Sequence, residues 1–411
     1  MFYQDHLARA LAEQRDEFAS FCAAWQDETR EYANALRRSL RERTVEEINE
    51  AALQSSKGPG ALLSPEFAAE RVVGRPFREQ WRSHEEARRW ALETLRDRVT
   101  FAADGSQLLP GREISLPTAA VQIAFFENAH RDGGSYRKDA RLFIVSPREL
   151  LEGYGEANWT AESVISYRRF VEEIKALADF IERQRGWCER GERVPLGFFD
   201  GTLLISYARP RTSLQDKYIE AILDLVARSR EARVPIVGFI DQSYARDIVN
   251  FIGSFEAAGQ KRRTTSLYDA QILSAEADGD EDDASSFGNW GDRTGFFYCL
   301  REGLTGDFLD EGGRSRIGFV YLQTMGEGAP ARLDVPTWVY ESNLLDEVID
   351  TVRAECVVGN GYPYPIEAAD AAAVITTRDR ERFLRAMQEF AARENFSFYL
   401  SRKTTSKARR R

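Results

Sequence analysis

Two apolar segments of the 411-residue sequence end in the same way, with an aspartate, a glycine and a small hydroxyl residue. The first is FAADGS, which contains Asp104, and the second is GFFDGT, which contains Asp200. A lone aspartate of this kind is more often a turn residue, but a carboxylate at the end of a buried strand needs a partner. Two neighbouring carboxylates resist joint ionisation unless a cation lies between them. Oxygen ligands favour Mg²⁺ or Mn²⁺, so the pair predicts a metal-dependent phosphodiesterase site.

The elements around these aspartates predict a mixed sheet. In order, they are strands at 99–106, 118–128 and 140–147, a long helix at 160–185, a strand at 194–204, a helix at 213–232 and a strand at 234–241. Hairpin-linked strands followed by βαβ units form a mixed sheet with helices on its faces. The first and fourth strands can be neighbours in such a sheet, which would bring Asp104 and Asp200 to one edge.

The long helix offers a third ligand. Its apolar stripe comprises Val164, Tyr167, Phe170, Val171, Ile174, Leu177, Ala178 and Ile181. Glu173 lies roughly 100° from the centre of this stripe, whereas Glu172 lies roughly 160° away and is expected to face water. Glu173 is therefore the better candidate to reach the sheet edge. The alternative is that both glutamates are solvated.

The C-terminal segment GYPYPIEAADAAAVI combines a rigid turn with a helix start. Pro363 and Pro365 fix the extended turn, and the helix is expected to begin close to Glu367 with Asp370 in its first turn. There Asp370 would complement the helix dipole. Tyr362 would pack into the core.

These motifs resemble the NurA family of DNA double-strand-break repair nucleases. The matching pieces are AADGS, FFDGTLL, the glutamate helix between them and GYPYPIEAADAAAVI, over roughly residues 95 to 376. Aspartate on the first strand, glutamate on the long helix and aspartate on the fourth strand is the order of ribonuclease H-like nucleases. The resemblance thus implies a ribonuclease H-like α/β fold, a mixed sheet flanked by helices.

The resemblance also implies an activity and a site. The activity is that of a 5′-to-3′ DNA exonuclease and single-strand endonuclease in end resection, which uses Mn²⁺ with Mg²⁺ as the alternative. The partners are DNA, a second copy of the chain and a HerA-type hexameric ATPase that translocates DNA. Carried over by position, Asp104, Glu173, Asp200 and Asp370 are metal ligands, and Tyr362 lies beside them as a catalytic residue. Many relatives have histidine where this chain has Asp370, and a carboxylate cannot act as a histidine's neutral base.

Composition narrows the classes of protein. A formal net charge of −10 argues against broad electrostatic binding of nucleic acid but allows a local basic track. The four cysteines are scattered without CxxC spacing, which fits a reducing compartment and no zinc site. The sequence has no long apolar run and no signal-peptide pattern, so we expect a cytoplasmic protein without membrane contact.

The predicted organisation has three parts. Residues 1–95 form a helical extension for dimer or partner contacts, residues 96–400 the nuclease domain, and residues 401–411 a basic tail. Residues 55–60 read as a linker, and residues 262–295 as a polar insertion with an acidic loop at 276–283.

Other charged residues have less specific expectations. Asp241 is expected to cap the helix that follows it. For Arg246, Arg262, Arg263 and the terminal Arg409–Arg411, phosphate contact and surface solvation both stay open.

Two other functions are compatible with the motifs. One is a different ribonuclease H-like enzyme, either a ribonuclease or a Holliday-junction endonuclease. The other is a non-catalytic adaptor subunit of a DNA translocase. The sequence contains no GxxxxGK[ST] motif, so the chain is not itself a P-loop motor. Four converging acids favour a catalytic role.

Overall fold

The computed structural model describes residues 3–111, 114–153, 159–205, 212–256, 267–275, 287–303, 306–326, 328–397 and 399. Its contacts divide the chain into two compact units. Unit 1 comprises residues 1–80 and 240–337, and unit 2 comprises residues 81–239 and 338–411. The boundary expected near residue 95 thus falls inside unit 2.

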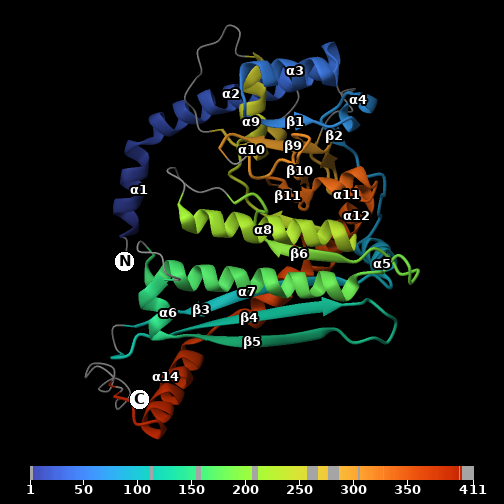
Figure 1. The fold of residues 1–411 in the computed structure, drawn as a ribbon. Helices are drawn as coiled ribbons and strands as arrows, with labels where there is room; N and C mark the ends of the chain where they lie inside the picture. Colours follow the sequence, from blue (N-terminus) through green and yellow to red (C-terminus); the bar gives the residue numbers. More distant parts are fainter. Residues whose placement is uncertain are drawn as a thin grey trace. The chain divides into compact units, whose positions relative to one another are not determined.

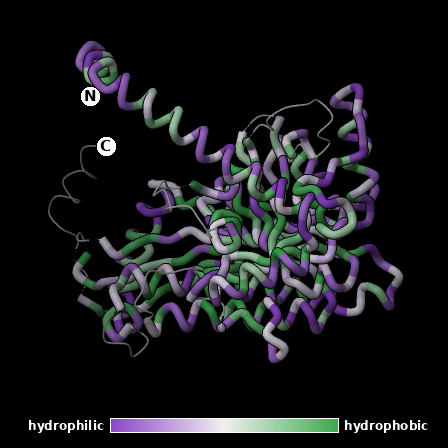
Figure 2. The backbone as a smooth tube through the Cα atoms, turned by 90° about the horizontal axis from the view of Figure 1, so that it is seen from above, coloured by the Kyte–Doolittle hydropathy of each residue, from purple (hydrophilic) through white to green (hydrophobic). Residues whose placement is uncertain are grey.

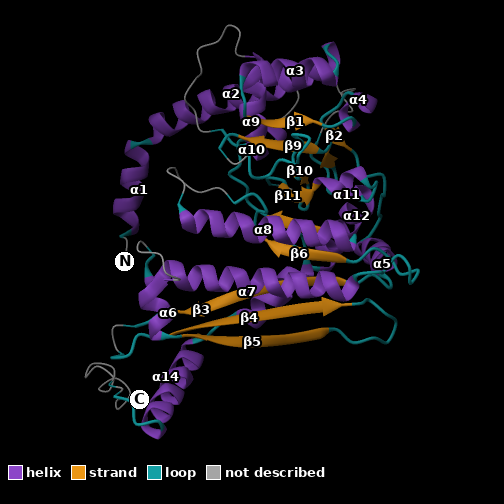
Figure 3. Ribbon diagram, in the orientation of Figure 1, coloured by secondary structure: helices purple, strands orange, loops and turns teal. Residues whose placement is uncertain are grey.

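Unit 2 is built on a mixed sheet with the strand order β7-β6-β3-β4-β5 (Figures 1 and 3). The strands are β3 (Thr100–Leu108), β4 (Ala119–Asn128), β5 (Arg137–Val145), β6 (Leu196–Asp200) and β7 (Ile236–Ile240). β3, β4 and β5 are antiparallel neighbours, whereas β6 pairs in parallel with both β3 and β7. An antiparallel meander continued by two parallel strands is the ribonuclease H-like topology. The predicted fold class is confirmed.

Helices cover both faces of this sheet. α7 (Ala161–Gln184) and α8 (Ser213–Ala232) pack on one face, and α13 (Tyr364–Ala373) packs on the other (Figure 1). The other helices of unit 2 are α5 (His84–Leu95), α6 (Pro147–Glu152), α11 (Thr337–Glu341), α12 (Leu345–Val358) and α14 (Thr377–Arg393).

α7 begins at a capping box, in which Thr160 and Ser163 satisfy each other's backbone N–H groups. The helix lies close to the sheet, because a Cβ atom on Gly197 would be 2.6 Å from Leu177 Cδ1. The Phe101 and Phe180 rings stack across the same interface, with centroids 4.8 Å apart. β3 is thus a central strand held by helices on both sides, a stable frame for Asp104.

Unit 1 contains an antiparallel sheet whose strands come from both of its sequence segments, residues 1–80 and 240–337. Its strands are β1 (Pro59–Leu63), β2 (Gly74–Arg75), β8 (Arg293–Thr294), β9 (Phe297–Arg301), β10 (Ile317–Leu322) and β11 (Ala331–Pro336). Its helices are α1 (Gln4–Glu13), α2 (Arg15–Glu42), α3 (Val45–Ser55), α4 (Glu66–Glu70), α9 (Asp247–Glu256) and α10 (Asp269–Leu273). β1 pairs with β9, and α3 and α9 pack against β1.

Three expectations for unit 1 are wrong. Pro59 and Gly60, placed in a linker, begin strand β1 because they pair with Arg301 and Leu300. Within the expected insertion at 262–295, the described flanks include α10 and β8, both buried. Asp241 does not cap α9, since the carboxylate of Asp269 accepts the N–H groups of the first three residues of that helix at 2.9–3.0 Å.

The helical segment that begins at the N-terminus is mainly hydrophilic, with short hydrophobic stretches (Figure 2). None of the helices within the described ranges has the length and apolar composition needed to cross a membrane. Arg262, Arg263, the acidic loop at 276–283 and the tail at 401–411 lie outside the described residues; Arg246 is described and exposed.

Candidate active site

Asp104 and Asp200 occupy matching positions on adjacent parallel strands. Ala103 of β3 is in register with Phe199 of β6, so the next residue of each strand is an aspartate. Neighbouring strands lie about 4.8 Å apart, and residues in register project to the same face. Gly201 then takes φ = +124°, a conformation that strongly favours glycine, and turns the chain away from the sheet. The expectation that both aspartates end a strand is wrong for Asp104, because β3 continues through it to Leu108, whereas Asp200 is the last residue of β6. The register nevertheless places the two carboxylates side by side.

Glu173 of α7 reaches the same part of β3, because Gly105 leaves room for it. A Cβ atom at Gly105 would lie 2.4 Å from Glu173 Oε1 and 2.6 Å from Arg169 Cγ. A side chain at position 105 would force Glu173 and Arg169 to shift from these positions. The glycine of the first aspartate–glycine motif thus admits an acid from the helix.

α13 brings Asp370 to the site, and the turn before this helix brings Tyr362. The hydroxyl group of Tyr362 donates a hydrogen bond to Asp200 Oδ1 at 3.0 Å, and its ring packs edge-on against Phe239 with centroids 5.0 Å apart. The helix begins at Tyr364, three residues before the expected start, because a proline is tolerated in the first turn. Asp370 consequently lies in the second turn, where the helix dipole no longer accounts for an acid.

The acids act on one another electrostatically. Burial raises the pKa of Asp104 to about 6, and the charges of Asp200 and Asp370 add to this effect. Burial likewise raises the pKa of Glu173 to about 8, again with contributions from Asp104 and Asp200. The pKa of Asp200 is raised by partial desolvation and by Asp370, although the Tyr362 hydrogen bond opposes the shift. All four predicted acids therefore belong to one cluster, with Asp200 and Asp370 exposed and Asp104 and Glu173 more enclosed.

The expectation that Glu172 faces water is wrong. Glu172 is only 8% exposed. Its Oε1 atom lies 2.9 Å from Lys175 Nζ and 3.2 Å from Arg168 Nε. Glu172 lines a pocket together with Ile123 of β4 and Phe143 of β5, so protein also covers this side of the helix. Glu172 points into a different part of unit 2 from the acid cluster.

Arg169 is a site residue that the sequence reading missed. Its Nε atom lies 3.4 Å from Glu173 Oε1, and its charge lowers the pKa values of Asp104, Glu173 and Asp200. Arg169 could have been predicted from its spacing, because it lies four residues before Glu173 and residues four apart share a helix face. The cluster is thus four acids beside one half-exposed arginine.

The donor set fits a hard divalent cation, although the side chains do not enclose one. In the part of the chain that the structure describes, no group of three or more His, Cys, Asp or Glu side chains is arranged to hold a metal ion. However, Glu173 Oε1 is buried and accepts no hydrogen bond, so one Arg169 contact at 3.4 Å is a poor substitute for ligation. Four oxygen donors that repel one another are the ligands that Mg²⁺ and Mn²⁺ prefer.

Comparisons with solved structures return distant similarities. A crystal structure of NurA shares 10% identity, with a TM-score of 0.39, over 71% of this chain and 88% of that one. A crystal structure of NurA with manganese shares 10%, with a TM-score of 0.36, over 71% and 89%. The catalytic domain of human Endonuclease V shares 13%, with a TM-score of 0.28, over 74% and 96%. A search of curated proteins gives no match.

The family comparison is specific. The model of the NurA domain matches residues 98–375, a segment that contains all four acids and Tyr362. It covers more than half of the sequence, so the chain belongs to the NurA family, a family of nucleases.

Proposed function

We propose that the protein is a metal-dependent DNA nuclease that resects DNA ends, as a 5′-to-3′ exonuclease and single-strand endonuclease. The observation that carries this proposal is the cluster of Asp104, Glu173, Asp200 and Asp370, in which the neighbouring charges help to raise the pKa values of the first three acids. Such a cluster is unfavourable without a cation. Polarity and the choice of DNA ends rest on the family resemblance.

The four acids would hold Mn²⁺ or Mg²⁺, with Asp104 and Glu173 as the inner ligands and Asp200 and Asp370 on the solvent side. When bound, the cation would supply a Lewis acid that activates water and neutralises charge on the leaving oxygen. Tyr362 fixes Asp200 by its hydrogen bond to Oδ1, which leaves Oδ2 for ligation. Arg169 supplies a fixed positive charge beside the phosphate position and offsets part of the repulsion among the acids.

The two other functions differ from this one in what they require. A ribonuclease or junction endonuclease would use the same acids on another substrate. An adaptor subunit would have no need to keep Glu173 with its pKa raised to about 8, because an unpaired buried acid costs stability. The acid cluster therefore favours catalysis over a purely structural role.

The test is cleavage of linear DNA by the purified protein. We expect degradation with Mn²⁺, weaker degradation with Mg²⁺ and none with EDTA, because the proposed site consists of oxygen donors that cannot act without the cation. RNA and a four-way junction of matching sequence are the comparison substrates. Full activity after exhaustive chelation would contradict the proposal, and a preference for RNA or for the junction would favour the corresponding alternative.

We further propose that the chain works as a homodimer with a HerA-type hexameric translocase, in the cytoplasm. Support comes from the N-terminal arm, defined here as residues 4–27. α1 has no buried residue, and in α2 burial begins only at Glu28. The arm nevertheless exposes Leu7, Leu11, Phe18 and Phe21, each 46–59% accessible. These residues recur at helical spacing, a pattern that suits a partner helix or groove.

Deletion of residues 4–27 is expected to weaken dimerisation or binding of the translocase, because it removes the exposed apolar stripe. The deletion ends before α3 and β1, which are part of the unit 1 core. The full-length double variant Leu11→Asp and Phe18→Asp disrupts the same apolar stripe without shortening the chain, so it should weaken assembly in the same way. Size-exclusion chromatography with light scattering, with and without the translocase, measures both states. If the deletion variant has the same oligomeric state as the full-length protein and the same affinity for the translocase, the N-terminal arm is not the contact surface.

A further inference from the structure

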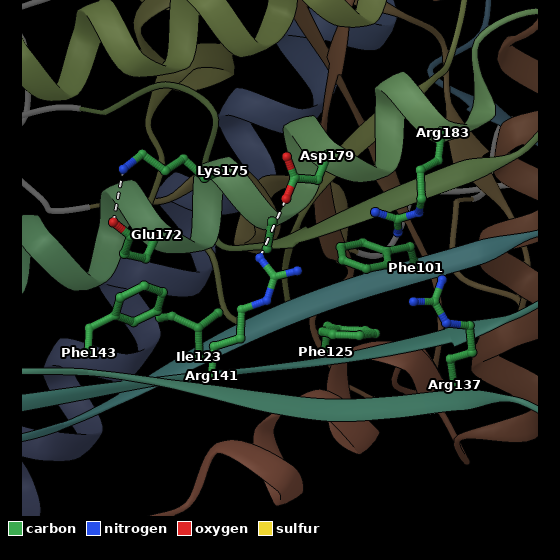
Figure 4. Close-up of a pocket in the computed structure, with 11 residues that line it drawn as sticks. Phe101, Ile123, Phe125, Arg137, Arg141, Phe143, Glu172, Lys175, Asp179 and Arg183 are labelled. Carbon is green, nitrogen blue, oxygen red and sulfur yellow. Dashed lines mark hydrogen bonds and ion pairs between the residues drawn. The ribbon is translucent and has the colours of Figure 1, made fainter.

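We propose that unit 2 contains a second nucleic-acid contact, a groove that binds the backbone of single-stranded DNA outside the acid cluster. The arginine groove is defined by Phe101, Phe125, Arg137, Arg141, Lys175 and Arg183, and lies between α7 and strands β3, β4 and β5 (Figure 4). Its ligand class rests on the proposed function, whereas the groove itself is a feature of the structure.

Guanidinium groups lie over aromatic rings along the groove. The Arg183 guanidinium is 5.8 Å from the centre of the Phe101 ring, and that of Arg137 is 5.7 Å from the centre of Phe125. The two rings form the buried floor, 1% and 9% exposed, and stack with centroids 5.8 Å apart. The two arginines therefore lie beside a rigid apolar surface and stay partly exposed to solvent. Such planar cations can contact phosphates and stack on bases.

The cations are available to a ligand. The side chains of Arg137, Arg141, Lys175 and Arg183 are 39–62% exposed. They pair with nearby acids, and Figure 4 shows two of these pairs as dashed lines, Arg141 with Asp179 at 3.6 Å and Lys175 with Glu172 at 2.9 Å. The Arg141–Asp179 pair is exposed on both sides, and such pairs contribute about 0–1 kcal/mol. Lys175 pairs with the enclosed Glu172, and Arg137 and Arg183 share Glu127, whose side chain is 12% exposed. A phosphate group, which an arginine can bind through two hydrogen bonds, can replace Asp179 and can bind the outward donors of the other cations.

The shape favours a flexible single strand. The enclosed volume is ≈ 40 Å³, enough for only a few water molecules, so a ligand must lie across the groove rather than enter a pocket. A single strand can place phosphates on four successive cations and bases on the guanidinium planes. The groove also starts at Glu172, the neighbour of Glu173 in α7. It thus lies along the helix that supplies the inner acid of the proposed site, and would hold substrate near it.

The test uses the full-length double variant Arg141→Gln and Lys175→Gln. Its matched control is Arg185→Gln with Arg228→Gln, two surface arginines of unit 2 with similar exposure. Binding of a fluorescent single-stranded DNA oligonucleotide in EDTA is followed by anisotropy at several salt concentrations. We expect the groove variant to bind at least about fivefold more weakly, with a salt slope lower by about 1.4, or about 0.7 for each lost phosphate contact. The control should bind like the wild type.

Two further measurements keep the proposal separate from the catalytic one. Hydrolysis of bis(p-nitrophenyl) phosphate with Mn²⁺, a substrate too small to reach the groove, should be equal in groove variant and wild type. Wild-type affinity of the groove variant would overturn the proposal, as would equal losses in variant and control, binding of RNA alone, or a change of oligomeric state by light scattering. The wild type could hydrolyse neither linear DNA nor bis(p-nitrophenyl) phosphate and still bind the oligonucleotide more tightly than the groove variant does. In that case the nuclease proposal fails, but the groove proposal stands.

Discussion

Replacement of Asp104 or Asp200 by asparagine is expected to lower Mn²⁺-dependent DNA cleavage by at least about 1,000-fold while the protein stays folded. Each substitution removes a charged ligand from a cation whose contribution to the reaction is several kcal/mol, and each 1.36 kcal/mol is about tenfold in rate. The measurement is cleavage of end-labelled linear DNA, together with the thermal unfolding of each metal-free variant.

The stability of these variants gives the test its second readout. In the metal-free protein the charges of Asp104 and Asp200 repel each other and Asp370, so an asparagine should leave the melting temperature unchanged or raise it. Tyr362→Phe, which removes only the hydrogen bond to Asp200, is a milder comparison variant. If both asparagine variants unfold, the aspartates are structural turn residues and the site assignment fails.

The fold of unit 2 was predictable because its signals are local. Alternating apolar residues, the glycines after Asp104 and Asp200, and the apolar stripe of α7 each depend on a few neighbouring residues. The register that aligns Asp104 with Asp200 then follows from the mixed topology. An aspartate and a glycine after an apolar segment were thus enough to indicate which acids would come together, although β3 continues past Asp104 to Leu108.

The wrong expectations depend on residues far apart in the sequence. β1 is a strand because it pairs with β9, more than 230 residues later. Asp269 caps α9 from over 20 residues away, which no local pattern indicates. The burial of Glu172 depends on side chains from strands that precede α7 in the sequence. A helical projection shows the stripe that faces the sheet, but it does not show that Ile123 and Phe143 lie in the same pocket as Glu172.

The substitution Glu173→Gln is expected to lower DNA cleavage at least about 100-fold and to weaken binding of Mn²⁺, because Glu173 is the enclosed acid beside Asp104. Glu172→Gln is the matched variant on the same helix, one residue away. It alters a carboxylate that pairs with Arg168 and Lys175, so Mn²⁺ affinity should equal that of the wild type. Isothermal titration with Mn²⁺ measures this difference without relying on activity.

The pH dependence of stability gives an independent check on Glu173. Its pKa is about 8 in the folded protein against 4.5 for a free glutamate, so between these values the folded state binds more protons than the unfolded state. The free energy of unfolding of the metal-free protein therefore falls as pH rises from about 4.5 to about 8. Mn²⁺ needs the ionised acid, so its stabilising effect should grow over the same range. Glu173→Gln should flatten both trends and Glu172→Gln should keep them. The opposite ranking would mean that Glu172 is the acid that belongs to the metal site.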